Sequence, residues 1–229
     1  MVLRPILPVL QHRCSRLVLV VIFIYCPFHD RFMARGKNDL ILRDRLQFTL
    51  NAQGDLDVVY GRVDLSDYVS VVNNQGLSIK EMRVHIRNPS GTDDTGVFNP
   101  NLIAGLTPEG TVDVASMKIF GTTTAYESAV DVGIGSPNTF FNAEIVSFAS
   151  RPTGFDTPVA FSNTYTEFGT PDLHPEGYVV VSDVLVGIAS RQAAAYADAT
   201  LELDIMLIAE PIKVTKDELK EMLAQATDL

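Results

Sequence analysis

The residues best suited to acid–base catalysis are scarce in this 229-residue chain, because only His85 and His174 lie beyond residue 32. His85 stands between Arg83 and Arg87 in an alternating run, which is typical of a surface or interface position on a strand. His174 lies between prolines in the segment TPDLHPEG, which predicts a loop. The chain has no Gly-x-Ser-x-Gly pattern, so the sequence indicates no nucleophilic hydrolase.

Metal-binding residues are present but do not form a known pattern. Asp93 and Asp94, with Asn99 and Asn101 nearby, offer the oxygen ligands that calcium prefers. Their spacing does not match the helix–loop–helix calcium motif, and segments rich in Asp and Asn usually form turns. The sequence therefore predicts no metal, with a calcium site left as an open alternative.

Thiol and phosphate chemistry are also poorly indicated. Cys14 and Cys26 both lie in the first 32 residues, so the rest of the chain has no thiol nucleophile and no zinc cluster of cysteines. Gly133 and Gly135 form a fragment of a phosphate-binding pattern without its third glycine, and Pro137 makes a turn the better interpretation. We predict that the chain is not an enzyme and uses no cofactor.

The charge is acidic and unevenly distributed. The net charge is −10, but residues 1–32 hold four arginines and one acid, and the remainder holds 14 bases and 27 acids. Such a surface repels phosphate backbones at long range. A short basic segment is the exception, and two interpretations stay open for it: a solvated tail, as short charge runs usually are, or a segment that makes weak contact with nucleic acid. Its bases are Arg35, Lys37, Arg43 and Arg45.

The first 32 residues differ in composition from the rest. Leu17–Tyr25 is a run of nine apolar residues, about half of the roughly 20 that a membrane-spanning helix needs. It resembles the apolar region of a secretory signal, but no small-x-small cleavage pattern follows. Met33 opens a segment that is typical of an ordinary protein start. Three interpretations stay open: a mis-assigned start, a signal or tethering segment, and a genuine N-terminal arm.

From Leu40 onward the sequence predicts strand after strand. Apolar residues alternate with polar ones over short runs separated by Gly, Pro, Asn and Asp, whereas residues 89–110 concentrate turn formers and predict a long loop. The absence of strand–helix alternation favours an all-β, antiparallel, jelly-roll-like sandwich. The predicted strands are Asp44–Leu50, Asp55–Leu65, Leu77–Arg87, Val112–Phe120, Thr123–Ile134, Phe140–Phe148, Val159–Tyr165, Tyr178–Ala189 and Thr200–Ala209.

A C-terminal helix is predicted after the last strand. Thr215 and Glu218 have the spacing of a capping box, and apolar residues follow at helical spacing. This stripe must be buried either on the chain's own sheet or on another subunit, so it is a candidate assembly contact. Its candidate contact residues are Leu219, Met222 and Leu223.

These observations divide the chain into four parts. They are the signal-like segment or mis-assigned start (1–32), an N-terminal arm (33–45), the jelly-roll sandwich (46–213) and the C-terminal helix (214–229).

In the general style of residues 43–91 and 179–223, the chain resembles a small viral coat protein of the single-jelly-roll kind. The resemblance implies a virion structural protein that assembles with copies of itself into an icosahedral capsid and uses no cofactor. The short basic segment departs from the strongly basic arm of coat proteins that package naked nucleic acid. An acidic shell over an internal membrane or beside other capsid proteins would fit this departure. The alternative is a secreted or cell-surface β-sandwich that binds a ligand.

Overall fold

The computed structural model describes residues 39–91, 95–105, 107–158, 160–168 and 177–225. All of them belong to one compact unit, Arg35–Leu229. The three interpretations of residues 1–32 concern a segment outside the described residues.

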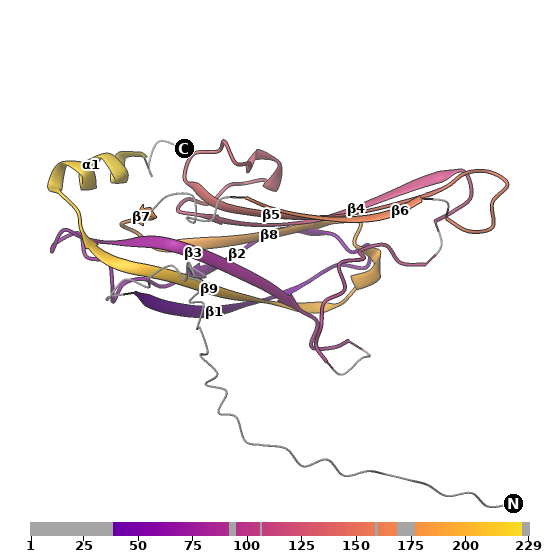
Figure 1. Cartoon of the computed structure of the whole chain (residues 1–229), viewed down its shortest axis with the longest axis horizontal. Helices are drawn as coiled ribbons and strands as arrows, with labels where there is room; N and C mark the ends of the chain where they lie inside the picture. Colours follow the sequence, from indigo (N-terminus) through magenta and orange to yellow (C-terminus); the bar gives the residue numbers. More distant parts are fainter. Residues whose placement is uncertain (1–38, 92–94, 106, 159, 169–176, 226–229) are drawn as a thin grey trace, which may run out of the picture. The chain divides into compact units, whose positions relative to one another are not determined.

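Two antiparallel sheets stacked face to face make up the described part of the chain (Figure 1). The four-stranded sheet has the order β1-β9-β3-β7, and the five-stranded sheet has the order β2-β8-β4-β5-β6. The strands are β1 (Leu40–Thr49), β2 (Leu56–Val63), β3 (Gln75–Arg87), β4 (Thr111–Thr122), β5 (Thr139–Arg151), β6 (Ala160–Phe168), β7 (Tyr178–Val180), β8 (Val184–Arg191) and β9 (Thr200–Lys213).

The pairing of the strands is nested along the chain. β4 pairs with β5, β3 with β7, β2 with β8 and β1 with β9, so each pair encloses the previous one. This nested winding, folded into two sheets, is that of a jelly roll, and β6 is an extra strand added beside β5. The predicted fold class is confirmed.

Alternating apolar residues fill the space between the sheets. In β9, Leu201, Leu203, Ile205, Leu207 and Ala209 are buried while the residues between them are less so. The opposite sheet supplies side chains such as those of Met117 and Ile119 to the same core. Because strand side chains alternate between faces, the residues between the buried ones of β9 point to the outer face of the four-stranded sheet.

One predicted strand is absent. Residues 123–138 form a loop that contains a 3-10 turn, η1 (Ala129–Asp131), instead of the strand Thr123–Ile134. Apolar alternation in this segment was misleading, because Val130 and Ile134 are largely exposed. The loop's carbonyl groups bond side chains rather than a neighbouring strand: the Lys118 ammonium donates to Ala129 O at 3.1 Å and also to Val132 O. Gly133 and Gly135 lie in the turn region that the sequence predicted.

This loop covers part of the outer face of the five-stranded sheet. The Tyr60 hydroxyl accepts from Tyr126 N at 2.7 Å and donates to Tyr126 O at 2.9 Å. Phe120 is fully buried and meets Tyr60 edge to face, with ring centroids 5.8 Å apart. Burial raises the pKa of Tyr60. The sandwich therefore has a small second apolar region outside its main core.

Two strand boundaries also differ from the expectation. The run Tyr178–Ala189 is divided into β7 and β8, because the chain crosses from one sheet to the other between Val180 and Val184. β1 begins at Leu40, which pairs with Ala209, so residues 40–45 belong to the sandwich rather than to an arm.

The C-terminal helix is present as α1 (Lys216–Gln225). Its capping box is formed: Glu218 N donates to Thr215 Oγ1 at 3.3 Å, and Thr215 N donates to Glu218 Oε2 at 2.9 Å. The bond from the Thr215 backbone lowers the pKa of Glu218. Leu219 is buried against Val181 and Val214 of the same chain.

Candidate functional site

The outer face of the four-stranded sheet gathers basic side chains from distant parts of the sequence. The register places His85 opposite Asp204 and Arg87 opposite Glu202, with β9 between β1 and β3. Directly across β9, the register places Arg45 beside Asp204 and Arg43 beside Met206. We call this surface the arginine face, formed by Arg43 and Arg45 of β1, Arg83, His85 and Arg87 of β3, and Glu202, Asp204 and Met206 of β9.

The acids of β9 partly neutralise these bases. Arg45 Nε lies 2.6 Å from Asp204 Oδ1, and Arg45 Nη1 lies 3.4 Å from Glu202 Oε2. Arg87 Nη1 also lies 3.4 Å from Glu202 Oε2. The hydrogen bond to Asp204 raises the pKa of Arg45, which keeps this guanidinium charged. Among the described residues, Arg43 makes no ion pair, so its charge is the most available on the face.

The arginine face is hollowed into a shallow groove of about 670 Å³, lined by residues that include Arg43, Arg83, His85 and Met206. Arg83 pairs with Glu81 of its own strand. A groove of mixed charge without enclosed walls can hold an extended polar chain. Within the described residues, no group of three or more His, Cys, Asp or Glu side chains is placed to hold a metal ion.

The predicted nucleic-acid contacts are placed only in part. Arg43 and Arg45 lie on the arginine face, whereas Arg35 and Lys37 lie outside the described residues. The alternation predicted that Arg83, His85 and Arg87 share one face of their strand. It did not show that Arg43 and Arg45 lie on the same sheet face, with only β9 between the two strands. That information lies in the pairing of both β1 and β3 with β9, the last strand of the chain.

The other predicted sites have simple structural explanations where the structure describes them. Asn99 and Asn101 make turns, since Asn99 Oδ1 accepts from Asn101 N at 3.0 Å and Asn101 Oδ1 accepts from Ile103 N at 3.1 Å. Asp93, Asp94 and His174 lie outside the described residues.

The predicted assembly contact on α1 is partly used within the chain. Leu219 is buried in its own small cluster, and Met222 packs against the same cluster while staying partly exposed. The side chain of Leu223 is not among the described ones. Leu219 therefore has no apolar surface left for another subunit, and a contact through Met222 stays a prediction.

Sequence reasoning missed an exposed aromatic surface, which lies along the β6 edge of the five-stranded sheet. All nine residues of β6 are exposed, including Phe161, Tyr165 and Phe168. In Figure 1, β6 and the adjoining ends of β4 and β5 reach beyond the four-stranded sheet, which explains why every residue of β6 is exposed. Val112 and Val114 at the same end of β4 are also exposed.

Tyr165 illustrates the environment of this edge. Its hydroxyl donates to Glu167 Oε2 at 2.9 Å, two residues along the same strand. Partial burial and this bond raise the pKa of Tyr165 to about 12, so the phenol is neutral at any ordinary working pH.

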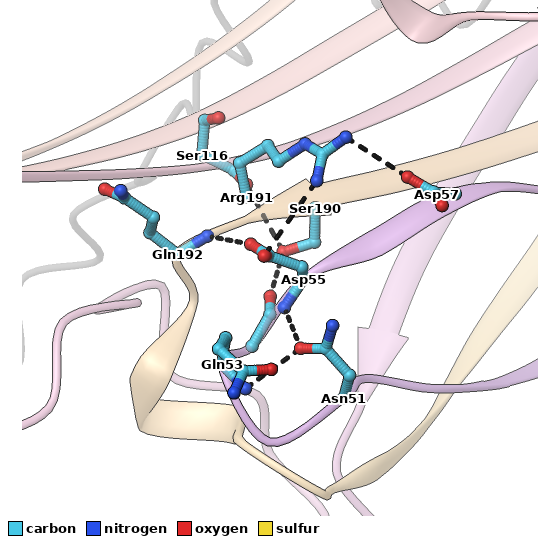
Figure 2. A network of polar contacts seen from close by, with 9 residues as sticks. Asn51, Gln53, Asp55, Asp57, Ser116, Ser190, Arg191 and Gln192 are labelled. Carbon is cyan, nitrogen blue, oxygen red and sulfur yellow. Dashed lines mark hydrogen bonds and ion pairs between the residues drawn. The ribbon is translucent and has the colours of Figure 1, made fainter.

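A second groove, of about 490 Å³, lies on the outer face of the five-stranded sheet beside the η1 loop. Two ion pairs lie in it: Lys118 Nζ lies 3.4 Å from Glu144 Oε1, and Arg191 Nη2 donates to Asp57 Oδ1 at 3.1 Å. Figure 2 shows that Arg191 belongs to a network that joins the start of β2 to the end of β8. We assign this network a structural role.

In the part of the chain that the structure describes, no helix is long and apolar enough to cross a membrane.

The fold and its surfaces define a jelly-roll domain with one basic sheet face and one open, aromatic sheet edge. No protein-family model and no curated protein matches the sequence. Among solved structures, a chain from Desmodium yellow mottle tymovirus is similar at 13% sequence identity and a TM-score of 0.27, covering 93% of this chain and 97% of that one. The fold assignment rests on the nested strand order alone.

Proposed function

We propose that this chain is a virion structural protein, a capsid subunit that assembles with copies of itself into an icosahedral shell. The observation that carries the proposal is a jelly roll in which, among the described residues, one sheet edge is a fully exposed strand that carries three aromatic side chains. Jelly rolls serve as capsid domains but also as lectins and cupins, so the fold alone does not decide the function. Exposed apolar patches and free strand edges are typical of protein–protein contact.

The grooves support a structural role over an enzymatic one. Both are open to solvent, and ion pairs occupy part of the charge in each: Arg45 with Asp204 in the first and Lys118 with Glu144 in the second. We infer that the chain is not an enzyme and needs no cofactor. Its location would be the virion, with other capsid proteins or an internal membrane as further neighbours of an acidic shell.

Assembly is tested by light scattering coupled to size exclusion, and by negative-stain microscopy, on the full chain over a range of salt and protein concentration. We expect species larger than the monomer that grow with concentration and form rings, shells or sheets. A strictly monomeric protein under every condition would contradict the proposal. It would favour the alternative, a secreted or cell-surface sandwich that binds a ligand.

The arginine face supports a second, weaker proposal, contact with the genome. Arg43 is the available cation of a groove that can accommodate an extended backbone. We expect Arg43→Ala to weaken binding of a fluorescent single-stranded oligonucleotide and to reduce the slope of log affinity against log salt by about 0.7, the value for one lost phosphate contact. Lys220→Ala, which removes an exposed charge on α1, is the matched control. Equal losses of affinity in both variants would show that binding depends only on the net charge of the chain and not on the arginine face.

A further inference from the structure

Three of the four sheet edges in the described residues are protected against pairing with another chain, and one is not. β7 has only three residues, β1 carries Arg43, Asp44 and Arg45, and β2 contains a bulge between Leu56 and Val59. Short strands, charges and bulges are the usual protections of a sheet edge. β6 has nine residues, no proline, no lysine and a single charge, Glu167.

We propose that β6 is the contact between two copies of this chain, which pair antiparallel, edge to edge, about a two-fold axis at Asn163. This inference rests on the proposed assembly function and names the surface that performs it. The axis at Asn163 places Phe161 of one copy directly opposite Tyr165 of the other. Because the contact is two-fold, that aromatic pair occurs twice. Directly opposed aromatic residues are among the more stabilising cross-strand pairs.

The orientation of these side chains follows from the register with β5. Phe161, Asn163 and Tyr165 pair with Ala149, Ser147 and Ile145, whose side chains are buried on the inner face of the sheet. Directly opposed residues share a face, so these β6 residues continue the inner face of the five-stranded sheet beyond the cover of the other sheet. Pairing with a second copy would extend this apolar inner face across the two-fold axis.

Charge favours a second copy as the occupant. Two molecules of net charge −10 repel each other, so a contact between them needs a surface with few acids. β6 is such a surface, because its nine residues contain only one acid. An axis at Asn163 puts the two Glu167 side chains at opposite ends of the paired strands, so no like charges face each other.

The available area agrees with this occupant. An aromatic side chain has roughly 150–250 Å² to bury, so the three half-exposed aromatic residues of β6 present about 300 Å². The other six residues of the strand are exposed as well. Pairing along the whole strand can therefore supply part of the roughly 800 Å² per partner of a specific interface.

Disulfide trapping tests the register in the full chain, with Cys14→Ser and Cys26→Ser so that only the added thiol reacts. Asn163→Cys is expected to give a covalent dimer on mild oxidation, because directly opposed strand residues lie at the separation of about 4.5–5.5 Å that a disulfide requires. Thr164→Cys and Thr166→Cys, equally exposed on the same strand, should not cross-link, since each would lie two or more residues out of register with its copy.

The outcomes separate this inference from the proposed function. Cross-linking at Thr164 instead of Asn163 would overturn the register, and equal cross-linking at all three positions would indicate random collision and overturn the paired edge. A chain that still assembles but cross-links at none of them would overturn the β6 contact while leaving assembly in place. A chain that never assembles would overturn both.

Tyr165→Lys supplies a second measurement, because lysine is a natural protection of sheet edges and the exposed site should accept it without loss of the fold. We expect self-association to weaken by about ten-fold or more in sedimentation equilibrium, since one substitution removes both aromatic pairs. Val130→Lys, at an exposed apolar site on the η1 loop, is the control and should leave self-association unchanged. Unchanged association of Tyr165→Lys would overturn the proposal.

Discussion

Replacing Gly54 by alanine is expected to lower the free energy of unfolding by at least about 3 kcal/mol, from a strained backbone and an overpacked contact together. Gly54 has φ = +78°, a conformation that L side chains rarely adopt. A Cβ atom there would overlap the carbonyl group of Ala193 and lie 2.7 Å from Ala194 N. Both neighbours are backbone, so neither can move aside as a flexible side chain would.

The surrounding hydrogen bonds explain why the turn cannot shift to make room. Gly54 O accepts from Ala193 N at 3.3 Å and from the Ser190 hydroxyl at 3.1 Å. Figure 2 shows how Asn51 and Asp55 hold the two sides of this turn, with Asn51 Oδ1 accepting from Asp55 N at 2.8 Å and Asp55 Oδ1 accepting from Gln192 N at 2.7 Å. Moving the chain at Gly54 would break bonds that join β2 to β8.

Two other glycines separate the causes of the loss. Gly154 has φ = +88°, and a Cβ atom at this position would meet nothing within 4 Å, so Gly154→Ala should cost about 1 kcal/mol from backbone strain alone. Gly133 has open space and no positive φ, so Gly133→Ala should change stability by less than about 0.5 kcal/mol. Urea unfolding followed by circular dichroism measures all three, since the chain has no tryptophan. A Gly54→Ala loss no larger than that of Gly154→Ala would refute the close backbone approach.

Replacing Lys80 by methionine is expected to lower the free energy of unfolding by about 3 kcal/mol, because it leaves a buried carboxylate without its cation. Lys80 is the extra residue of a bulge in β3, between Ile79 and Glu81. Its ammonium lies 2.7 Å from Asp39 Oδ1 and 2.5 Å from Glu210 Oε2. The Asp39 side chain is only 5% exposed, so water cannot replace the lost partner.

The same site predicts a pH dependence. Hydrogen bonds to Asp39 and Glu210 raise the pKa of Lys80 above its ordinary value of 10.5. Protonation of Lys80 is thus more favourable in the folded state, and its stabilising effect is fully present below pH 10.5 and is lost as the pH rises through the folded-state pKa. The difference in stability between the native chain and Lys80→Met should therefore narrow above pH 10.5.

Two variants control the Lys80 experiment. Lys220→Met removes an exposed lysine of α1 and should change stability by less than about 0.5 kcal/mol. Adding Asp39→Asn to Lys80→Met should recover part of the loss, since the buried charge is then absent. If the double variant is less stable than Lys80→Met, packing of the lysine stem rather than charge would be the cause.

Much of the fold could be predicted from local patterns. Alternation in β9 and the turn residues between runs indicated strands, and the capping box of Thr215 and Glu218 predicted α1, because each of these signals involves neighbours in the chain. The same patterns were wrong for residues 123–138. There the loop's carbonyl groups accept hydrogen bonds from the Lys118 ammonium, a partner on β4 that periodicity does not reveal.

Local patterns thus predicted the fold class, the terminal helix and the apolar faces of most strands. The choice of neighbouring strands became visible only in the folded chain: Leu40 pairs with Ala209, the arginines of β1 and β3 share one face, and β6 forms an edge of the described sheet. Alternation sets the face to which a side chain points, but it does not specify the partner strand. Partners are selected by the packing of the whole core and by nested pairings that close over long stretches of chain.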